Sequence, residues 1–169
     1  MKKSLDILWA PWRVSYITQN KKNKGCFLCK ALKSKDDKKN FVLYRGKNAF
    51  VIFNIYPYNN GHLMIVPNRH TAIIEKIKEE ESKELFFLLQ ASTRIIKKVI
   101  KPAGFNIGIN LGAYAGAGVA GHLHIHIVPR WKGDANFMPV IADSKVISQS
   151  LEELYNRLYP EFRELTRCT

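Results

Sequence analysis

The chain has 169 residues, enough for one domain that buries most of its apolar surface. Its hydrophobic content of 46% is ordinary for a globular protein, and no apolar run approaches the ~18 residues that a membrane-spanning helix needs. The charged start, residues 1–6, is followed by no apolar signal core, so we expect a cytoplasmic protein without a membrane segment. The formal net charge of +13 suits an anionic partner.

Charge alone leaves two kinds of anionic partner open, a polyphosphate substrate and a nucleic acid. The lysines crowd into two polar stretches, residues 21–24 and 33–39, which are typical of solvated loops. No helix-turn-helix, RNA-recognition or basic-aromatic motif accompanies them. We therefore expect a polyphosphate substrate and no specific nucleic-acid binding.

In chain order, residues 1–25 contain Trp9 and Trp12 but little periodicity, and we expect an irregular arm there. A knuckle or short helix is expected at 26–32, and a polar loop at 34–40. Stretches rich in β-branched and aromatic residues then predict strands at residues 41–45, 49–54, 62–66 and 105–110.

The clearest helix is predicted over residues 81–101, because apolar residues recur there at steps of three and four. Its stripe comprises Leu85, Leu88, Leu89, Ser92, Ile95, Ile96 and Val99. A shorter helix is expected at 71–78, and a terminal one at 148–159. Hairpin-joined strands with one inserted helix predict an α+β domain on an antiparallel sheet of about five strands, with a long helix and a C-terminal helix.

The segment Gly121–Arg130 carries three of the five histidines, in the pattern His-Leu-His-Ile-His-Ile. Residues two apart on a strand point to the same face, so His122, His124 and His126 are predicted to form a row with spacings of about 6.5–7 Å. A histidine nucleophile needs a neutral ring nitrogen, and the middle histidine is best placed to attack while its neighbours hold charge. The plain alternative is a surface strand with incidental histidines.

These residues resemble the histidine triad superfamily of nucleotide hydrolases and transferases. The resemblance rests on the alternating histidines, on Gly61–Pro67 with Asn54 before it, and on the glycine-rich residues 115–121. It covers about residues 26–136, leaving an N-terminal arm at 1–25 and a C-terminal helical extension at 137–169 within a single domain, 1–169. Residues 8–13, 115–121 and 129–131 look most like the bacterial diadenosine tetraphosphate phosphorylase-like branch.

The resemblance implies cleavage of dinucleoside polyphosphates through a nucleotidyl-histidine intermediate on His124, with water or inorganic phosphate as the acceptor. It gives His126 the phosphate and the leaving oxygen, and it implies a homodimer whose sheets meet edge to edge. Many hydrolases of the superfamily carry Gln-Ser or Gln-Thr before the triad, where this chain has residues 117–120 as Ala-Gly-Val-Ala. That departure favours phosphorolysis over simple hydrolysis.

Further substrate contacts are expected from Asn54, His62 and Asn110 by resemblance. Backbone amides near Gly116 and Gly118 could form a phosphate nest, because glycine lets a backbone approach closely. The alternatives are that both asparagines only satisfy turn backbone and that the glycine loop is a flexible turn.

A structural zinc site is also predicted. Cys26 and Cys29 form a Cys-x-x-Cys pair that suits two ligands of a tetrahedral zinc ion. His70 and His122 would complete the set, which some superfamily members use. The alternative is two free thiols, and the zinc role competes with a catalytic role for His122. At the level of function, a nucleotide-binding module without turnover and a charge-driven nucleic-acid binder stay open beside the enzyme.

Overall fold

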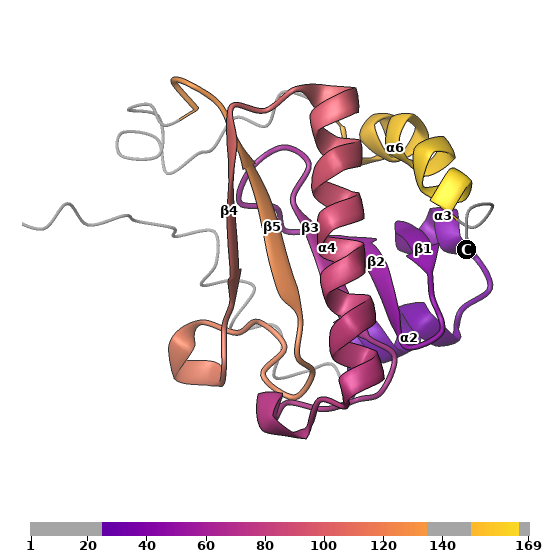
Figure 1. Cartoon of the computed structure of the whole chain (residues 1–169), viewed down its shortest axis with the longest axis vertical. Coiled ribbons are helices and arrows are strands. Elements are labelled where there is room, and N and C mark those ends of the chain that lie inside the picture. Colours follow the sequence, from indigo (N-terminus) through magenta and orange to yellow (C-terminus); the bar gives the residue numbers. More distant parts are fainter. Residues whose placement is uncertain (1–24, 135–149, 166–169) are drawn as a thin grey trace, which may run out of the picture. The chain divides into compact units, whose positions relative to one another are not determined.

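The computed structural model describes residues 25–134 and 150–165. Within them one antiparallel sheet has the strand order β1-β2-β3-β5-β4 (Figure 1). The strands are β1 (Val42–Arg45), β2 (Ala49–Phe53), β3 (Leu63–Pro67), β4 (Gly104–Ile109) and β5 (Ile125–Arg130). The predicted α+β fold with a five-stranded antiparallel sheet is therefore confirmed.

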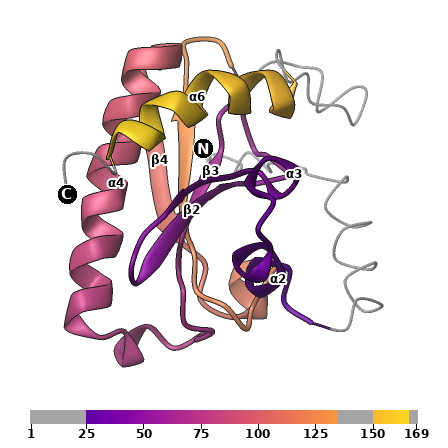
Figure 2. The ribbon, with the colours of Figure 1, turned by 90° about the vertical axis from the view of Figure 1, so that its right-hand side faces the viewer.

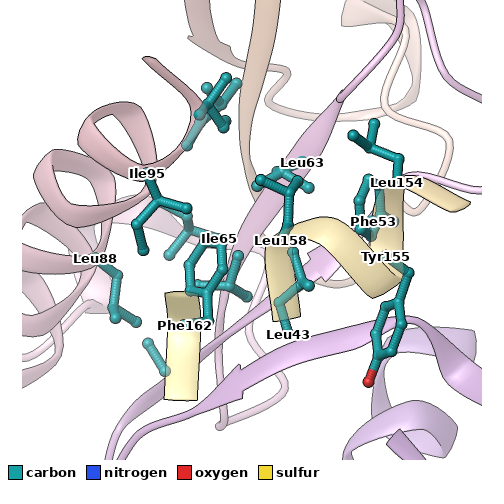
Figure 3. Packing of buried hydrophobic residues seen from close by; sticks show 14 of the residues in the cluster. Leu43, Phe53, Leu63, Ile65, Leu88, Ile95, Leu154, Tyr155, Leu158 and Phe162 are labelled. Carbon is teal, nitrogen blue, oxygen red and sulfur yellow. The ribbon is translucent and has the colours of Figure 1, made fainter. Parts of the chain in front are cut away.

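One face of the sheet is covered by α4 (Glu79–Ile100) and α6 (Leu151–Leu165) (Figures 1 and 2). The apolar stripe of α4 packs there, with Leu88 and Ile96 fully buried. Figure 3 shows Leu88 and Ile95 of α4 beside the aromatic ring of Phe162 from α6. This helix-covered face contains the larger of the two hydrophobic clusters.

The opposite face of the sheet carries the histidines. There α2 (Phe27–Lys33) packs on β1, β2 and β3 through the fully buried Leu28. Met64 of β3 pairs with His126 of β5 in the antiparallel register, so both lie on this face. Figure 2 shows α2 on the side of the sheet away from α4 and α6.

Outside the histidine segment, three predicted elements differ from the structure. The polar loop at 34–40 contains the short helix α3 (Asp37–Asn40), because Asp36 caps its first turn by accepting a hydrogen bond from Lys39 N at 3.0 Å. The helix expected at 71–78 is reduced to the 3₁₀ turn η1 (Ile74–Lys76).

The terminal helix was predicted to end at Tyr159, but α6 continues through Pro160 to Leu165. Proline removes one helical N–H, yet Phe162 beyond it is fully buried against the core. Tertiary packing therefore outweighs the local signal.

No helix within residues 25–134 and 150–165 is long and apolar enough to cross a membrane. The predicted arm up to residue 24 and about half of the C-terminal extension, residues 137–149 and 166–169, lie outside the described residues, so the proposed domain boundaries stay a prediction. So does the predicted start of the terminal helix at 148–149.

Candidate active site and metal centre

The histidine row does not lie wholly on a strand, because β5 begins only at Ile125. The amide of His122 donates to Val119 O at 3.2 Å, and that of Leu123 donates to Thr71 O at 2.7 Å. These two amides are therefore used in a turn and in a contact with the loop after β3, instead of in the sheet. The strand predicted to start at residue 122 starts three residues later.

The ring of His124 is oriented by the backbone of His122, two residues earlier. Its Nδ1 lies 2.8 Å from the backbone carbonyl oxygen of His122. A carbonyl oxygen only accepts, so Nδ1 must carry the proton and the lone pair of the neutral ring is on Nε2. Burial lowers the pKa of His124, outweighing the opposite effect of this hydrogen bond, and so favours the neutral ring. A buried imidazole with its lone pair on Nε2 is a competent nucleophile.

His126 lies next to His124, with ring centroids 4.7 Å apart and the planes 77° from parallel. Its Nδ1 is 2.9 Å from Nε2 of His62, whose own Nδ1 accepts a hydrogen bond from the Tyr58 amide at 3.0 Å. Since Nδ1 of His62 accepts, its Nε2 carries the proton and donates it to Nδ1 of His126. The proton of a neutral His126 ring is then on Nε2.

The side chain of His122 belongs to a different group. Its Nε2 donates to Pro67 O at 2.8 Å, which leaves the Nδ1 lone pair free to bind a cation. Nδ1 lies 3.4 Å from Cys26 Sγ, 3.5 Å from Cys29 Sγ and 3.3 Å from His70 Nδ1. The structure thus turns His122 toward the cysteines, and its ring contacts that of His70, with 4.9 Å between centroids.

These four residues could hold a metal ion, because their ligand atoms all lie within 4.8 Å of one another. The predicted ligand set of Cys26, Cys29, His70 and His122 is thus brought together from three distant parts of the chain. The same distances also allow thiol–imidazole hydrogen bonds in a metal-free protein.

Two of the predicted substrate contacts, Asn54 and Asn110, are partly engaged by the protein itself. Asn54 Oδ1 accepts the Tyr56 amide at 2.9 Å, which is the turn-forming role left open as the alternative. Asn110 Nδ2 lies 3.5 Å from Gly116 O, at the limit of a hydrogen bond.

His62 is fully buried, and its ring nitrogens face Tyr58 N and His126. The structure therefore places it behind His126, where it orients that ring.

The glycine-rich loop contains the short turn η2 (Ala113–Ala115). Gly116 adopts a positive φ of 84°, which glycine tolerates without strain. Its amide donates to Ala113 O at 3.0 Å, and that of Ala117 donates to Gly112 O at 3.3 Å. These two amides close the turn in this structure, and the phosphate nest at Gly116 and Gly118 stays a prediction.

Sequence reasoning missed the partners that orient the histidines. The carbonyls of Pro67 and Thr71 were not foreseen, because every residue has a carbonyl and none carries a signature. The contact between His62 and His126 had a signal, since both residues were singled out, but only the pairing of β3 with β5 brings them together.

The sequence of the chain matches a known family. The model of the HIT domain matches residues 35–133. The chain is also 40% identical over 168 residues to the AP-4-A phosphorylase of Mycobacterium tuberculosis, an alignment that covers 95% of this chain and 86% of that protein. The chain therefore belongs to the HIT domain family, as its histidine pattern predicted.

Two further similarities are more partial. The asymmetrical bis(5'-nucleosyl)-tetraphosphatase of Schizosaccharomyces pombe is 34% identical over 93 residues, which covers 55% of this chain and 50% of that protein. The crystal structure of a Zn-bound histidine triad family protein from Mycobacterium smegmatis matches with a TM-score of 0.66 at 23% identity, over 86% of this chain and 98% of that one. The latter similarity establishes the shared fold.

Proposed function

We propose that this protein cleaves dinucleoside polyphosphates of the diadenosine tetraphosphate type, through a nucleotidyl-histidine intermediate on His124. The observation that carries the proposal is the hydrogen bond from His124 Nδ1 to the His122 carbonyl, which leaves Nε2 as the nucleophilic atom. Within the described part of the chain, this is the one hydrogen bond that the His124 ring makes. The ring is thereby oriented without its lone pair being used.

In the first step, the Nε2 lone pair of His124 attacks the α-phosphorus next to one of the two adenosines. A phosphorus–nitrogen bond forms, and the bond from that phosphorus to the oxygen of the remaining polyphosphate breaks. His126 stabilises the leaving oxygen by donating a hydrogen bond from its Nε2–H, and diadenosine tetraphosphate releases ATP as an anion. In the second step an acceptor attacks the same phosphorus, the phosphorus–nitrogen bond breaks and its electron pair returns to Nε2 of His124, and the proton of the acceptor passes to solvent.

His62 and His126 act as a pair in this scheme. The Tyr58 amide fixes the tautomer of His62, and His62 fixes that of His126. His126 then presents a proton and no lone pair on Nε2, which is the form that a leaving oxygen needs. We assign His62 to positioning rather than to direct substrate contact.

Inorganic phosphate is the acceptor that we favour, with release of ADP from diadenosine tetraphosphate. Two observations support phosphorolysis over hydrolysis: the 40% identical relative is a phosphorylase, and residues 117–120 lack the Gln-Ser or Gln-Thr of many hydrolases. Water is the competing acceptor, because the chain is also similar to the tetraphosphatase of Schizosaccharomyces pombe.

Zinc is the metal that the Cys26, Cys29, His70 and His122 group suits best. Zinc bonds of about 2.3 Å to sulfur and about 2.05 Å to nitrogen make tetrahedral edges of about 3.5 Å between sulfur and nitrogen and about 3.3 Å between nitrogens. The observed separations of His122 Nδ1 from the sulfurs, 3.4 and 3.5 Å, and from His70 Nδ1, 3.3 Å, match these edges. We assign zinc a structural role, because four protein ligands leave no open position. His122 is then a ligand and does not bind the substrate phosphate.

We further propose a homodimer that forms through β4. This strand is an edge of the sheet, and its central residues Asn106, Ile107 and Gly108 are exposed. An exposed edge strand with an apolar side chain is a ready template for pairing with a second copy. Phe86 of α4, which is 61% exposed, lies on the helix flank that faces β4, as the position of Lys97 over the Phe105 ring indicates.

Product analysis tests the proposal directly. The protein is incubated with diadenosine tetraphosphate, with and without inorganic phosphate, and the nucleotides are separated. We expect ATP and ADP in the presence of phosphate. ATP and AMP, or ADP as the sole product, would show that the reaction is hydrolysis and not phosphorolysis. Binding without any product would favour a nucleotide-binding module.

A further inference from the structure

We infer that the ion pair between Arg69 and Glu81 is a positioning device for both the metal centre and the nucleophile. The inference rests on the proposed roles of the metal group and His124. Both residues lie outside the histidine pattern: Arg69 is on the loop after β3, and Glu81 is on the first turn of α4.

The ion pair is bidentate and shielded from water on one side. Arg69 Nε donates to Glu81 Oε1 at 2.9 Å, and its Nη2 donates to Oε2 at 2.7 Å. Glu81 is only 5% exposed, whereas the Arg69 side chain is 39% exposed. A fork-to-fork pair fixes direction as well as distance, which a single lysine contact does not.

The pair does more than cap a helix. Glu81 Oε2 already accepts the Lys78 amide at 2.9 Å, which satisfies the N-terminus of α4. Arg69 adds a bond from Nη2 to Lys76 O at 2.7 Å, and so ties both ends of the loop between β3 and α4 to one carboxylate. Asn68 secures the same loop from the other side by donating to Gly46 O at 3.1 Å.

The tethered residues are those that hold the histidine segment. Within residues 67–71, Pro67 O accepts from His122 Nε2 at 2.8 Å, and Thr71 O accepts from the Leu123 amide at 2.7 Å. Between them His70 contributes its Nδ1 to the metal group, 3.3 Å from Cys29 Sγ.

A shift of this loop would therefore move a metal ligand and the backbone of residues 122–123 together. The His122 carbonyl that orients His124 belongs to that backbone. Arg69 is central to this arrangement, because it lies between Pro67 and Thr71 in the sequence. Among the hydrogen bonds and ion pairs of residues 25–134 and 150–165, those of its side chain join this stretch to α4.

The test compares Arg69→Gln, Arg69→Lys and Glu81→Gln with the wild type. Glu81→Gln keeps an oxygen that can cap α4 but loses the charged fork. The first readout is the Kd for cobalt(II), from competition with a chelating indicator, together with the visible spectrum of the cobalt protein. We expect Arg69→Gln and Glu81→Gln to weaken cobalt binding about tenfold, the lower end of what outer partners of metal ligands contribute. Arg69→Lys should lie in between, since it restores the charge without the fork.

The second readout is turnover of diadenosine tetraphosphate. A displaced nucleophile should lower kcat about tenfold in Arg69→Gln while KM changes little, because the loop orients His124 and does not bind the nucleoside. Glu79→Gln is the matched control, since it breaks the exposed ion pair with Lys83 on the same turn of α4. We expect wild-type cobalt affinity and kcat in this control.

Unchanged cobalt affinity and spectrum in Arg69→Gln and Glu81→Gln would overturn the inference, as would equal losses in Glu79→Gln. A wild type that binds cobalt but does not cleave the substrate would instead refute the proposed reaction, and the cobalt measurement would still decide whether Arg69 and Glu81 position the metal centre.

Discussion

The backbone carbonyl of His122 lies 2.8 Å from Nδ1 of His124, while the side chain of His122 lies among Cys26, Cys29 and His70. One residue thus serves the metal group with its ring and the nucleophile with its backbone. In the proposed function the metal group supports the nucleophile without touching the reacting phosphate, so we expect different losses when each site is altered.

Replacing the nucleophile should abolish turnover and leave binding intact. His124→Asn removes the only atom to which the nucleotidyl group is transferred, so we expect kcat to fall by several orders of magnitude with little change in nucleotide affinity. Intact mass after a brief substrate pulse should show one added nucleoside monophosphate in the wild type and none in His124→Asn. Trapping should be done at high pH, because phosphorus–nitrogen bonds are labile in acid. An adduct on another residue would contradict the assignment.

Removing His126 or its partner should cost less than removing His124. His126→Asn loses the ring N–H that stabilises the charge on the leaving oxygen, an effect of about 10²–10³ in kcat. His62→Phe, which fills the buried site but cannot orient His126, should lower kcat about tenfold. His62→Gln should recover part of that loss, because its side-chain amide can donate to Nδ1 of His126 as Nε2 of His62 does. If the Phe and Gln variants have equal kcat, the orienting hydrogen bond has no catalytic role.

Replacing Cys26 and Cys29 should remove the bound zinc. Metal analysis of protein purified without chelator should find about one zinc per chain, and almost none in the double variant Cys26→Ser, Cys29→Ser. Loss of zinc should lower the Tm clearly. The kcat of the protein that remains folded should change little. Cys168→Ser is the control, because this cysteine is not part of the ligand set. Equal zinc in the double variant and the control would refute the site.

Dimer formation should depend on one flank of α4. Lys97 contacts Phe105 of β4, whereas the next residue, Lys98, pairs with Glu161 of α6 at 2.6 Å. Eleven residues make about three helical turns, so Phe86 lies on the β4 flank and Phe87 on the α6 flank.

Phe86→Glu should therefore weaken dimerisation more than tenfold, as loss of an interface anchor does, and Phe87→Glu should not. Sedimentation velocity over a range of concentrations measures both. A monomeric wild type, or equal effects of the two variants, would count against the β4 interface.

A stabilising substitution is expected at a buried position of α4. Ser92 is fully buried, and its hydroxyl has no hydrogen-bond partner within the described residues. Ser92→Ala removes an unsatisfied polar group and improves helix propensity, so the free energy of unfolding should rise by about 1 kcal/mol. For a chain of this size the Tm should rise by about 2–4 °C. A fall in Tm would show that the hydroxyl makes a contact worth more than its burial costs.

The sequence by itself determined the features that follow from local periodicity and residue type. Stretches rich in β-branched and aromatic residues predicted four strands, alternation predicted the common face of the histidines, and the 3.6-residue period predicted α4. The histidine pattern and the Cys-x-x-Cys pair named the nucleophile candidate and the metal ligands, because these chemistries need rare residue types at short, regular spacing.

Only the tertiary structure decided what joins these parts. It turned the ring of His122 toward Cys26 and Cys29, placed His62 behind His126, and used the carbonyls of Pro67 and Thr71 to hold residues 122–123. It also carried α6 past a proline, because a buried aromatic side chain beyond it gains more from packing than the missing hydrogen bond costs. Such contacts join residues tens of positions apart, often through backbone atoms that every residue has, and therefore leave no pattern in the sequence.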